Sequence, residues 1–162
     1  MKSLTEHLSQ YAGYHRDRRN IRTHLIGIPL IVIAIATLLA RPHWGAISPA
    51  LIVAVGCCLF YVRLNWRLGL VMTALLLLAC ALGWQLALLS TPLWLGWGVG
   101  LFVVGWLFQF VGHYFEGKKP AFIDDVTGLI IGPLFVVAEL GFYLGCLKKL
   151  KNDIESEAGP LH

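Results

Sequence analysis

Leu68 to Leu89 reads LGLVMTALLLLACALGWQLALL, an apolar run of 22 residues without a formal charge. A helix needs about 20 predominantly apolar residues to cross the hydrocarbon core of a bilayer, so this run is long enough to span a membrane. The composition of the whole chain agrees, since 57% of its 162 residues are hydrophobic and 14% are charged. Soluble domains carry roughly 25% charged residues. The sequence therefore predicts an integral membrane protein built from helices.

Four further apolar runs lie on either side of this one, separated by short polar or proline-containing turns. They are Ile21–Ala40, Ala46–Val62, Leu93–Val111 and Val126–Leu147. Gly132-Pro133 interrupts the last run, so we expect it to enter the membrane and return, with a single crossing as the alternative. The predicted fold is an all-α polytopic membrane helix bundle with four to six membrane segments.

The two ends of the chain are more polar than its centre. Residues 1–20 lack the apolar centre of a cleavable signal peptide. Ser3 and Glu6 have the spacing of a capping box, which predicts a helix start, and the weakly apolar face that follows favours a helix lying on the membrane surface. We divide the chain into an N-terminal interfacial helix (1–20), a transmembrane helical domain (21–147) and a polar C-terminal tail (148–162).

Basic residues gather before the first run, after the second and after the fourth. They are Lys2, Arg16, Arg18, Arg19, Arg22, Arg63, Arg67, Lys118 and Lys119. The turns on the other side hold only Arg41, so the positive-inside rule places the N-terminus in the cytoplasm. This pattern makes the net charge of +4 a matter of membrane orientation, and we expect no nucleic-acid partner. The expected location is a bacterial inner membrane, or the endoplasmic reticulum in a eukaryote.

Two polar segments, Tyr14–His24 and Gln109–Ala121, hold three of the six histidines. Four predicted crossings separate the segments, so both lie at the cytoplasmic face. His15 and His24 are nine residues apart and would point in opposed directions on one straight helix, so they converge only if the chain bends between them. Imidazole is the commonest metal ligand, and several histidines near a bilayer are costly without a task. We predict a metal site formed by His15, His24 and His113.

Both segments resemble one known family. The matching elements are Tyr14-His15, Asn20, His24, Gly27, Pro29, Phe108-Gln109, Gly112-His113, Phe115-Glu116, Pro120-Ala121 and Asp125. In spacing and context they are similar to the small membrane proteins related to the fungal 2-hydroxy fatty acid dioxygenase of fatty acid α-oxidation, over about residues 8–145. The resemblance implies Fe(II) as the cofactor, O2 and a 2-hydroxy fatty acid as substrates, loss of one carbon from the acid, and histidines that are needed for activity.

We expect the polar residues near the histidines to assist this chemistry. Asn20 and Asp125 are expected to orient imidazole N–H groups, and Glu116 is either a direct ligand or an ion partner of a nearby lysine. Glu139 stands in the middle of an apolar run, where a carboxylate is by default a functional candidate: a proton relay, a partner of a ligand, or a neutral acid bonded to another helix.

The arginines before the first run offer two interpretations. Arg19 and Arg22, with their basic neighbours, are expected to attract the substrate carboxylate, and the simpler alternative is that they anchor the chain at the membrane surface.

Two other functions stay open at this point: a non-enzymatic protein that binds membrane lipid or assists assembly, and a small proton-coupled transporter that uses Glu139. The glycine-rich run Leu93–Val111 suits a homodimer contact and internal packing equally well.

Overall fold

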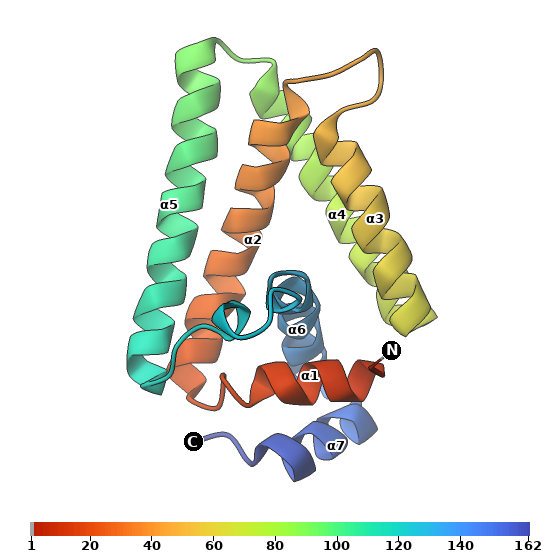
Figure 1. Ribbon diagram of the computed structural model, residues 1–162, viewed down its shortest axis with the longest axis vertical. Helices are drawn as coiled ribbons and strands as arrows, with labels where there is room; N and C mark the ends of the chain where they lie inside the picture. Colours follow the sequence, from red (N-terminus) through yellow and green to blue (C-terminus); the bar gives the residue numbers. More distant parts are fainter. Residues whose placement is uncertain (1) are drawn as a thin grey trace. The chain divides into compact units, whose positions relative to one another are not determined.

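The fold is made of helices. A computed structural model describes residues 2–162, and over that range the β pairing is limited to one isolated bridge, between Trp44 and Ile47. The elements are α1 (Leu4–Ala12), α2 (Arg18–Ala40), α3 (Pro49–Leu64), α4 (Trp66–Ala87), α5 (Thr91–Glu116), η1 (Ala121–Ile123), α6 (Gly128–Tyr143) and α7 (Lys148–Ala158). The prediction of an all-α fold is confirmed (Figure 1).

Three of these helices are long and apolar enough to cross a membrane: α2, α4 and α5. Helices α6 and α7 pass the same test as a pair bent by 116°, which raises the number of candidate spans to four. Helix α3 is apolar but has only 16 residues, fewer than the roughly 20 that a bilayer requires. The predicted polytopic membrane protein is therefore confirmed.

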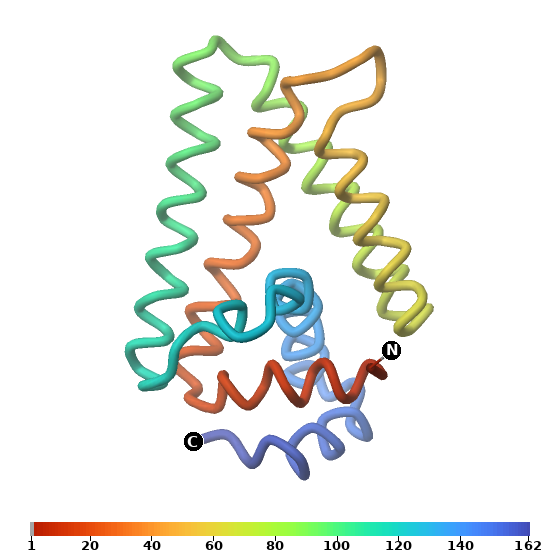
Figure 2. Tube along the Cα trace, in the orientation of Figure 1, coloured from red at the N-terminus to blue at the C-terminus, as the bar shows by residue number. Residues whose placement is uncertain are grey.

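The chain divides into two compact units. One contains the residues up to Ile28 together with Leu107–His162, and the other is Pro29–Trp106. Helices α2 and α5 each give one end to the first unit and the rest to the second. In the first unit, α1 packs against both α6 and α7, as the traces in Figure 1 and Figure 2 show. All residues of the candidate site described below belong to this unit.

Helix α1 begins where the sequence predicts it. The hydroxyl group of Ser3 accepts a hydrogen bond from the N–H of Glu6, and the Glu6 carboxylate accepts one from the N–H of Ser3, so the capping box is complete. Leu8 and Ala12 turn inward from α1 and are fully buried, as is Phe135 on α6. Burying a large apolar side chain contributes roughly 1.5–3 kcal/mol. The ring of Tyr11 on α1 also contacts that of Phe135 on α6, with ring centres 5.0 Å apart.

The expected break at Gly132-Pro133 is wrong. Helix α6 is continuous through Pro133, and α2 is likewise continuous through Pro29. The chain turns instead between α6 and α7, where Gly145 and Leu147 have φ angles of 75° and 58°. Membrane helices tolerate an internal proline because neighbouring groups satisfy the freed carbonyl, whereas a left-handed backbone cannot continue an α-helix.

The second unit is held by close helix contacts at glycines. Gly69 of α4 lies so near the backbone of Val62 in α3 that an added Cβ atom would stand 2.5 Å from its Cα. At Gly83, an added Cβ would stand 2.7 Å from the carbonyl carbon of Ala36 in α2. Small residues at such positions let membrane helices approach closely.

Candidate metal centre

Three histidines from separate segments meet at one point. His15 lies in the short connection between α1 and α2, His24 lies in the second turn of α2, and His113 lies near the end of α5. The Nε2 atoms of His15 and His24 are 3.0 Å apart, and the ring of His113 is 4.9 and 5.0 Å from theirs by ring centres. The side chains are buried, with exposed fractions of 0%, 1% and 7%. The bend that the sequence required between His15 and His24 is present.

Two of the imidazoles have a defined tautomer. The Nδ1–H of His15 donates to the carbonyl oxygen of Tyr11 at 2.7 Å, and the Nδ1–H of His24 donates to that of Asn20 at 2.9 Å. A carbonyl oxygen can only accept, so each Nδ1 carries the hydrogen and each Nε2 keeps a lone pair. The two lone pairs therefore face each other at 3.0 Å, which is repulsive unless a positive charge lies between them.

A shared proton is a poor candidate for that charge. Burial lowers the pKa of His15 well below the ordinary value of 6.5, and the nearby His24 lowers it further. A ring with such a pKa is neutral at physiological pH.

The third histidine offers a further ligand atom for a metal ion. Nδ1 of His113 is buried and has no hydrogen-bond partner, which is rare for a polar atom inside a protein. The three candidate ligand atoms lie within 4.8 Å of one another. Two nitrogens at about 2.1 Å from one ion can be at most about 4.2 Å apart, so small side-chain rotations would complete the site. Within the described part of the chain, this is the one group of three or more metal-ligating side chains that comes so close.

Aromatic side chains cover the back of the site. The ring of Tyr11 stacks on His15 with ring centres 4.2 Å apart and planes at 7°, and Phe135 contacts both rings. The packing holds the His15 imidazole in one orientation and excludes water behind it. Burial also raises the pKa of the Tyr11 hydroxyl group, so this group stays protonated.

Glu116 is adjacent to the site but is occupied by other partners. Its carboxylate accepts hydrogen bonds from the backbone N–H groups of Arg16 and Asp17 and from the side-chain amide of Asn20, all at 2.9–3.0 Å. It thereby fastens the connection that carries His15 to the end of α5. The two lysines considered as partners bind elsewhere: Lys118 to the carbonyl of Gly13, and Lys119 to Asp124.

Asn20 contacts the site in two ways. Its backbone carbonyl orients His24, and its side-chain Nδ2 donates to Glu116 and, at 3.3 Å, to the carbonyl of Tyr14. The orienting group is thus the backbone rather than the side-chain amide that the sequence suggested.

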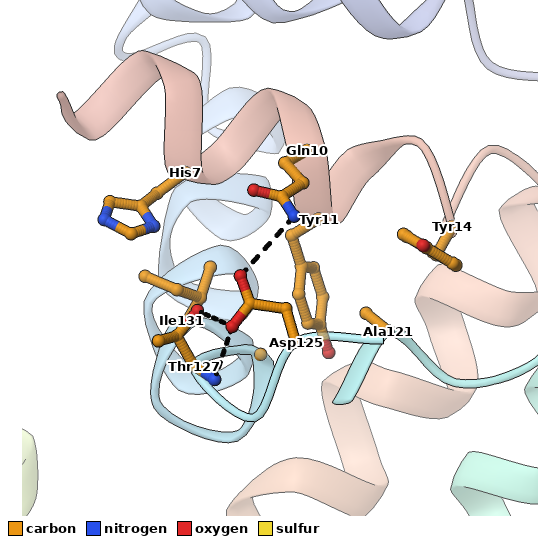
Figure 3. Close-up of a pocket in the computed structure, with 9 residues that line it drawn as sticks. His7, Gln10, Tyr11, Tyr14, Ala121, Asp125, Thr127 and Ile131 are labelled. Atoms are coloured by element: carbon orange, nitrogen blue, oxygen red, sulfur yellow. Dashed lines mark hydrogen bonds between the residues drawn. The ribbon is translucent and has the colours of Figure 1, made fainter. Parts of the chain in front are cut away.

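Asp125 lies away from the three imidazoles. Its carboxylate accepts hydrogen bonds from the N–H and the hydroxyl group of Thr127 and, at 3.5 Å, from the Gln10 side chain (Figure 3). These contacts close the turn before α6 and tie it to α1. His7 lines the same small pocket and is not one of the three converging histidines.

Glu139 lies beside the guanidinium group of Arg16 rather than beside the three histidines. Its carboxylate is 4.0 Å from the guanidinium of Arg16, a residue that is itself buried. The Arg16 guanidinium donates to the carbonyls of Ala12, His15 and Gly159, so it links α1, the His15 connection and the C-terminal segment. Nothing in the sequence pattern distinguishes the buried Arg16 from its exposed neighbours.

The two arginines expected to bind a carboxylate are not at the histidines. Arg19 pairs with Asp17 at 2.7 Å and lies over the ring of Phe115. Arg22 lines a cavity of about 250 Å³ with Arg18, Glu139 and several apolar side chains. Because residues two apart on a helix point in nearly opposite directions, this cavity is on the other side of α2 from His24.

Buried imidazoles with converging lone pairs, placed at the ends of membrane-length helices, define a candidate metal-binding membrane protein. The sequence comparisons specify the family. The family model described as 2-hydroxy-palmitic acid dioxygenase Mpo1-like matches residues 1–144, and the chain belongs to this family. The chain is 35% identical over 159 residues to the 2-hydroxy-palmitic acid dioxygenase MPO1 of Saccharomyces cerevisiae. The aligned region covers 95% of this chain and 88% of the relative. No solved structure matches the chain. The family indicated by the two polar segments is confirmed.

Proposed function

We propose that this protein is an Fe(II)-dependent dioxygenase that shortens 2-hydroxy fatty acids by one carbon, with O2 as the second substrate. The observation that carries the proposal is the facing pair of Nε2 lone pairs on His15 and His24, beside the unpartnered Nδ1 of His113. The family and the named activity of the yeast relative supply the reaction.

The donor set suits the proposed metal. Three neutral imidazoles leave coordination positions open for other ligands, as non-haem iron sites that use O2 require. When bound, Fe(II) supplies the redox chemistry with O2, which Zn(II) cannot supply. Among the described residues no carboxylate belongs to this group, so the protein ligands in this proposal are the three histidines.

The chain holds and shields these ligands. The carbonyls of Tyr11 and Asn20 fix the ligand tautomers, Tyr11 and Phe135 exclude water, and Glu116 holds the His15 connection against α5. Asp125 and Glu139 act at a distance: Asp125 through the turn before α6, and Glu139 through Arg16.

The basic cavity has a separate role in this proposal. Arg18 and Arg22 surround a space with apolar walls at the predicted membrane surface, and they attract the anionic head groups of lipids, including the substrate before it reaches the metal. Arg19, which is already paired with Asp17, adds only to the local positive potential.

The test is to load the purified protein with Fe(II) without oxygen, add O2 and 2-hydroxypalmitic acid, and analyse the products by mass spectrometry. We expect the odd-chain acid one carbon shorter. His24→Ala should abolish both iron binding and product, whereas His43→Ala, in the other unit, should leave both intact. Stoichiometric zinc with no product from the iron-loaded protein would refute the proposal.

A further inference from the structure

Two polar stripes face each other where α2 meets α5. Each consists of residues at positions i, i+3, i+4 and i+7, which share one face of a helix. They are Asn20, Thr23, His24 and Gly27 on α2, and Gln109, Gly112, His113 and Glu116 on α5. The stripes touch at Gly112, where an added Cβ atom would collide with the Thr23 hydroxyl oxygen and with Oδ1 of Asn20. The two metal ligands His24 and His113 are therefore only one part of a longer polar contact.

Two further atoms of these stripes are buried without a hydrogen-bond partner. Among the described residues, Oδ1 of Asn20 and Nε2 of Gln109 are both in this state. Asn20 is fully buried and Gln109 is 5% exposed. Because Nδ2 of Asn20 donates to Glu116 and to the carbonyl of Tyr14, the free end of that amide is the oxygen. The contact thus contains one free acceptor and one free donor, although buried polar groups are otherwise nearly always paired.

Gln109 lies on the apolar side of the metal site. It precedes His113 by one turn of α5, and side chains one turn apart are about 5–6 Å from each other at Cβ. Helical side chains also lean toward the N-terminus, which brings the His113 ring toward the Gln109 turn. On α2 the equivalent turn holds the buried Gly27, which has no side chain. A fatty acid whose chain lies within the membrane would pass this point with its first carbons.

We propose that Gln109 recognises the hydroxyl group on C2 of the fatty acid. Asn20 lies at the Glu116 end of the contact, about two helical turns from Gln109, so one hydroxyl group does not bind both amides. Nε2–H of Gln109 donates to the hydroxyl oxygen, whereas an unsubstituted C2 would leave this buried donor without a partner. This inference rests on the proposed function and adds to it the side chain that distinguishes a 2-hydroxy acid from an ordinary fatty acid.

The test compares binding of two acids to the Fe(II)-loaded full-length protein without oxygen, so that no turnover occurs. The acids are 2-hydroxypalmitic and palmitic acid, and the variant is Gln109→Leu, which has a similar size and no donor. Phe110→Leu changes the neighbouring, exposed position of the same helix and serves as the control. Iron content and the temperature of unfolding are measured on each protein.

We expect Gln109→Leu to reduce the preference for the 2-hydroxy acid by about tenfold, the effect of losing one hydrogen bond. Binding of palmitic acid, iron content and the control should stay as in the wild type. The unfolding temperature should not fall, because the lost amide had no partner in the protein. An unchanged preference, or a clear loss of stability without substrate, would overturn the inference. If the leucine variant does not fold, Gln109→Met provides the same test with an unbranched side chain.

The outcomes separate this inference from the proposed function. A wild-type protein that neither prefers 2-hydroxypalmitic acid nor makes the shortened acid contradicts the function itself. A wild-type protein that does both, with a Gln109→Leu variant of equal preference, contradicts only the role of Gln109.

Discussion

Replacing Glu116 tests whether the site depends on the connection between α1 and α2. In Glu116→Gln the side chain keeps its shape, but one acceptor oxygen becomes an NH2 group that would face N–H donors. The wild-type carboxylate accepts from the N–H groups of Arg16 and Asp17 and from Nδ2 of Asn20. We therefore expect the glutamine variant to lose at least one of these hydrogen bonds and to weaken the others.

The size of the effect follows from the number and kind of these bonds. A hydrogen bond to a charged group contributes about 1.5–3 kcal/mol, and the connection is only partly buried, so water replaces part of what is lost. A loss of about 2 kcal/mol in the free energy of unfolding is expected. Metal affinity should fall about 10- to 100-fold, as it does when groups that orient a ligand are removed, because His15 sits next to the freed N–H of Arg16.

The assay is titration of the metal-free protein with Fe(II) or Co(II) without oxygen, together with denaturant unfolding in detergent. Lys118→Gln is the matched control, because Lys118 lies two residues further on and binds the connection at Gly13 rather than at Arg16. If Glu116→Gln binds metal as tightly as the wild type and unfolds at the same denaturant concentration, the carboxylate does not position the site.

Four further results are expected. Gly112→Ala should cost about 1–3 kcal/mol in unfolding free energy and weaken metal binding, because the added methyl group overlaps atoms of α2; a neutral effect in the same unfolding assay would contradict the close contact. Fe(II) at 100 times its dissociation constant should stabilise the protein by about 2.7 kcal/mol, and calorimetry should find no such gain in His24→Ala. Glu139→Gln should leave metal content unchanged, whereas loss of proton flux in vesicles without loss of oxidation would favour a transporter. Arg18→Gln with Arg22→Gln should raise KM at low salt and leave kcat unchanged, and a fall in kcat alone would argue against the cavity as a docking site.

The sequence predicts the helices well because length and apolarity are enough to identify them. Each long run, such as Leu68–Leu89, corresponds to a helix, here α4. The prediction at Gly132-Pro133 failed because proline breaks helices reliably only where water competes for the freed backbone groups. The real turn, at Gly145 and Leu147, depends on a left-handed backbone at a leucine, for which the sequence pattern gives no sign.

The site was predictable where chemistry required convergence and unpredictable where local partners intervened. Three buried histidines need a common purpose, and the structure brings His15, His24 and His113 together. Asp125 and Arg19 find partners two residues away, Thr127 and Asp17, and such short-range contacts compete with any long-range role. The role proposed for Gln109 has a sign in the sequence, since the two polar stripes share the i, i+3, i+4, i+7 spacing of one helix face.

The proposed metal site also uses backbone groups at or beside the ends of two helices. Helix α1 ends at Ala12, and the carbonyl of Tyr11 in its last turn accepts a hydrogen bond from the side-chain Nδ1–H of His15. The N–H groups of Arg16 and Asp17, just before α2, are bound by Glu116. The last carbonyls and first N–H groups of a helix have no partner within the helix, and the helix dipole favours an anion at its start. The same set of contacts therefore caps these helix ends and holds the proposed ligand His15. A change that frees either helix end must also loosen His15, so the stability of the first unit and its affinity for metal should decrease together in any set of variants at these positions.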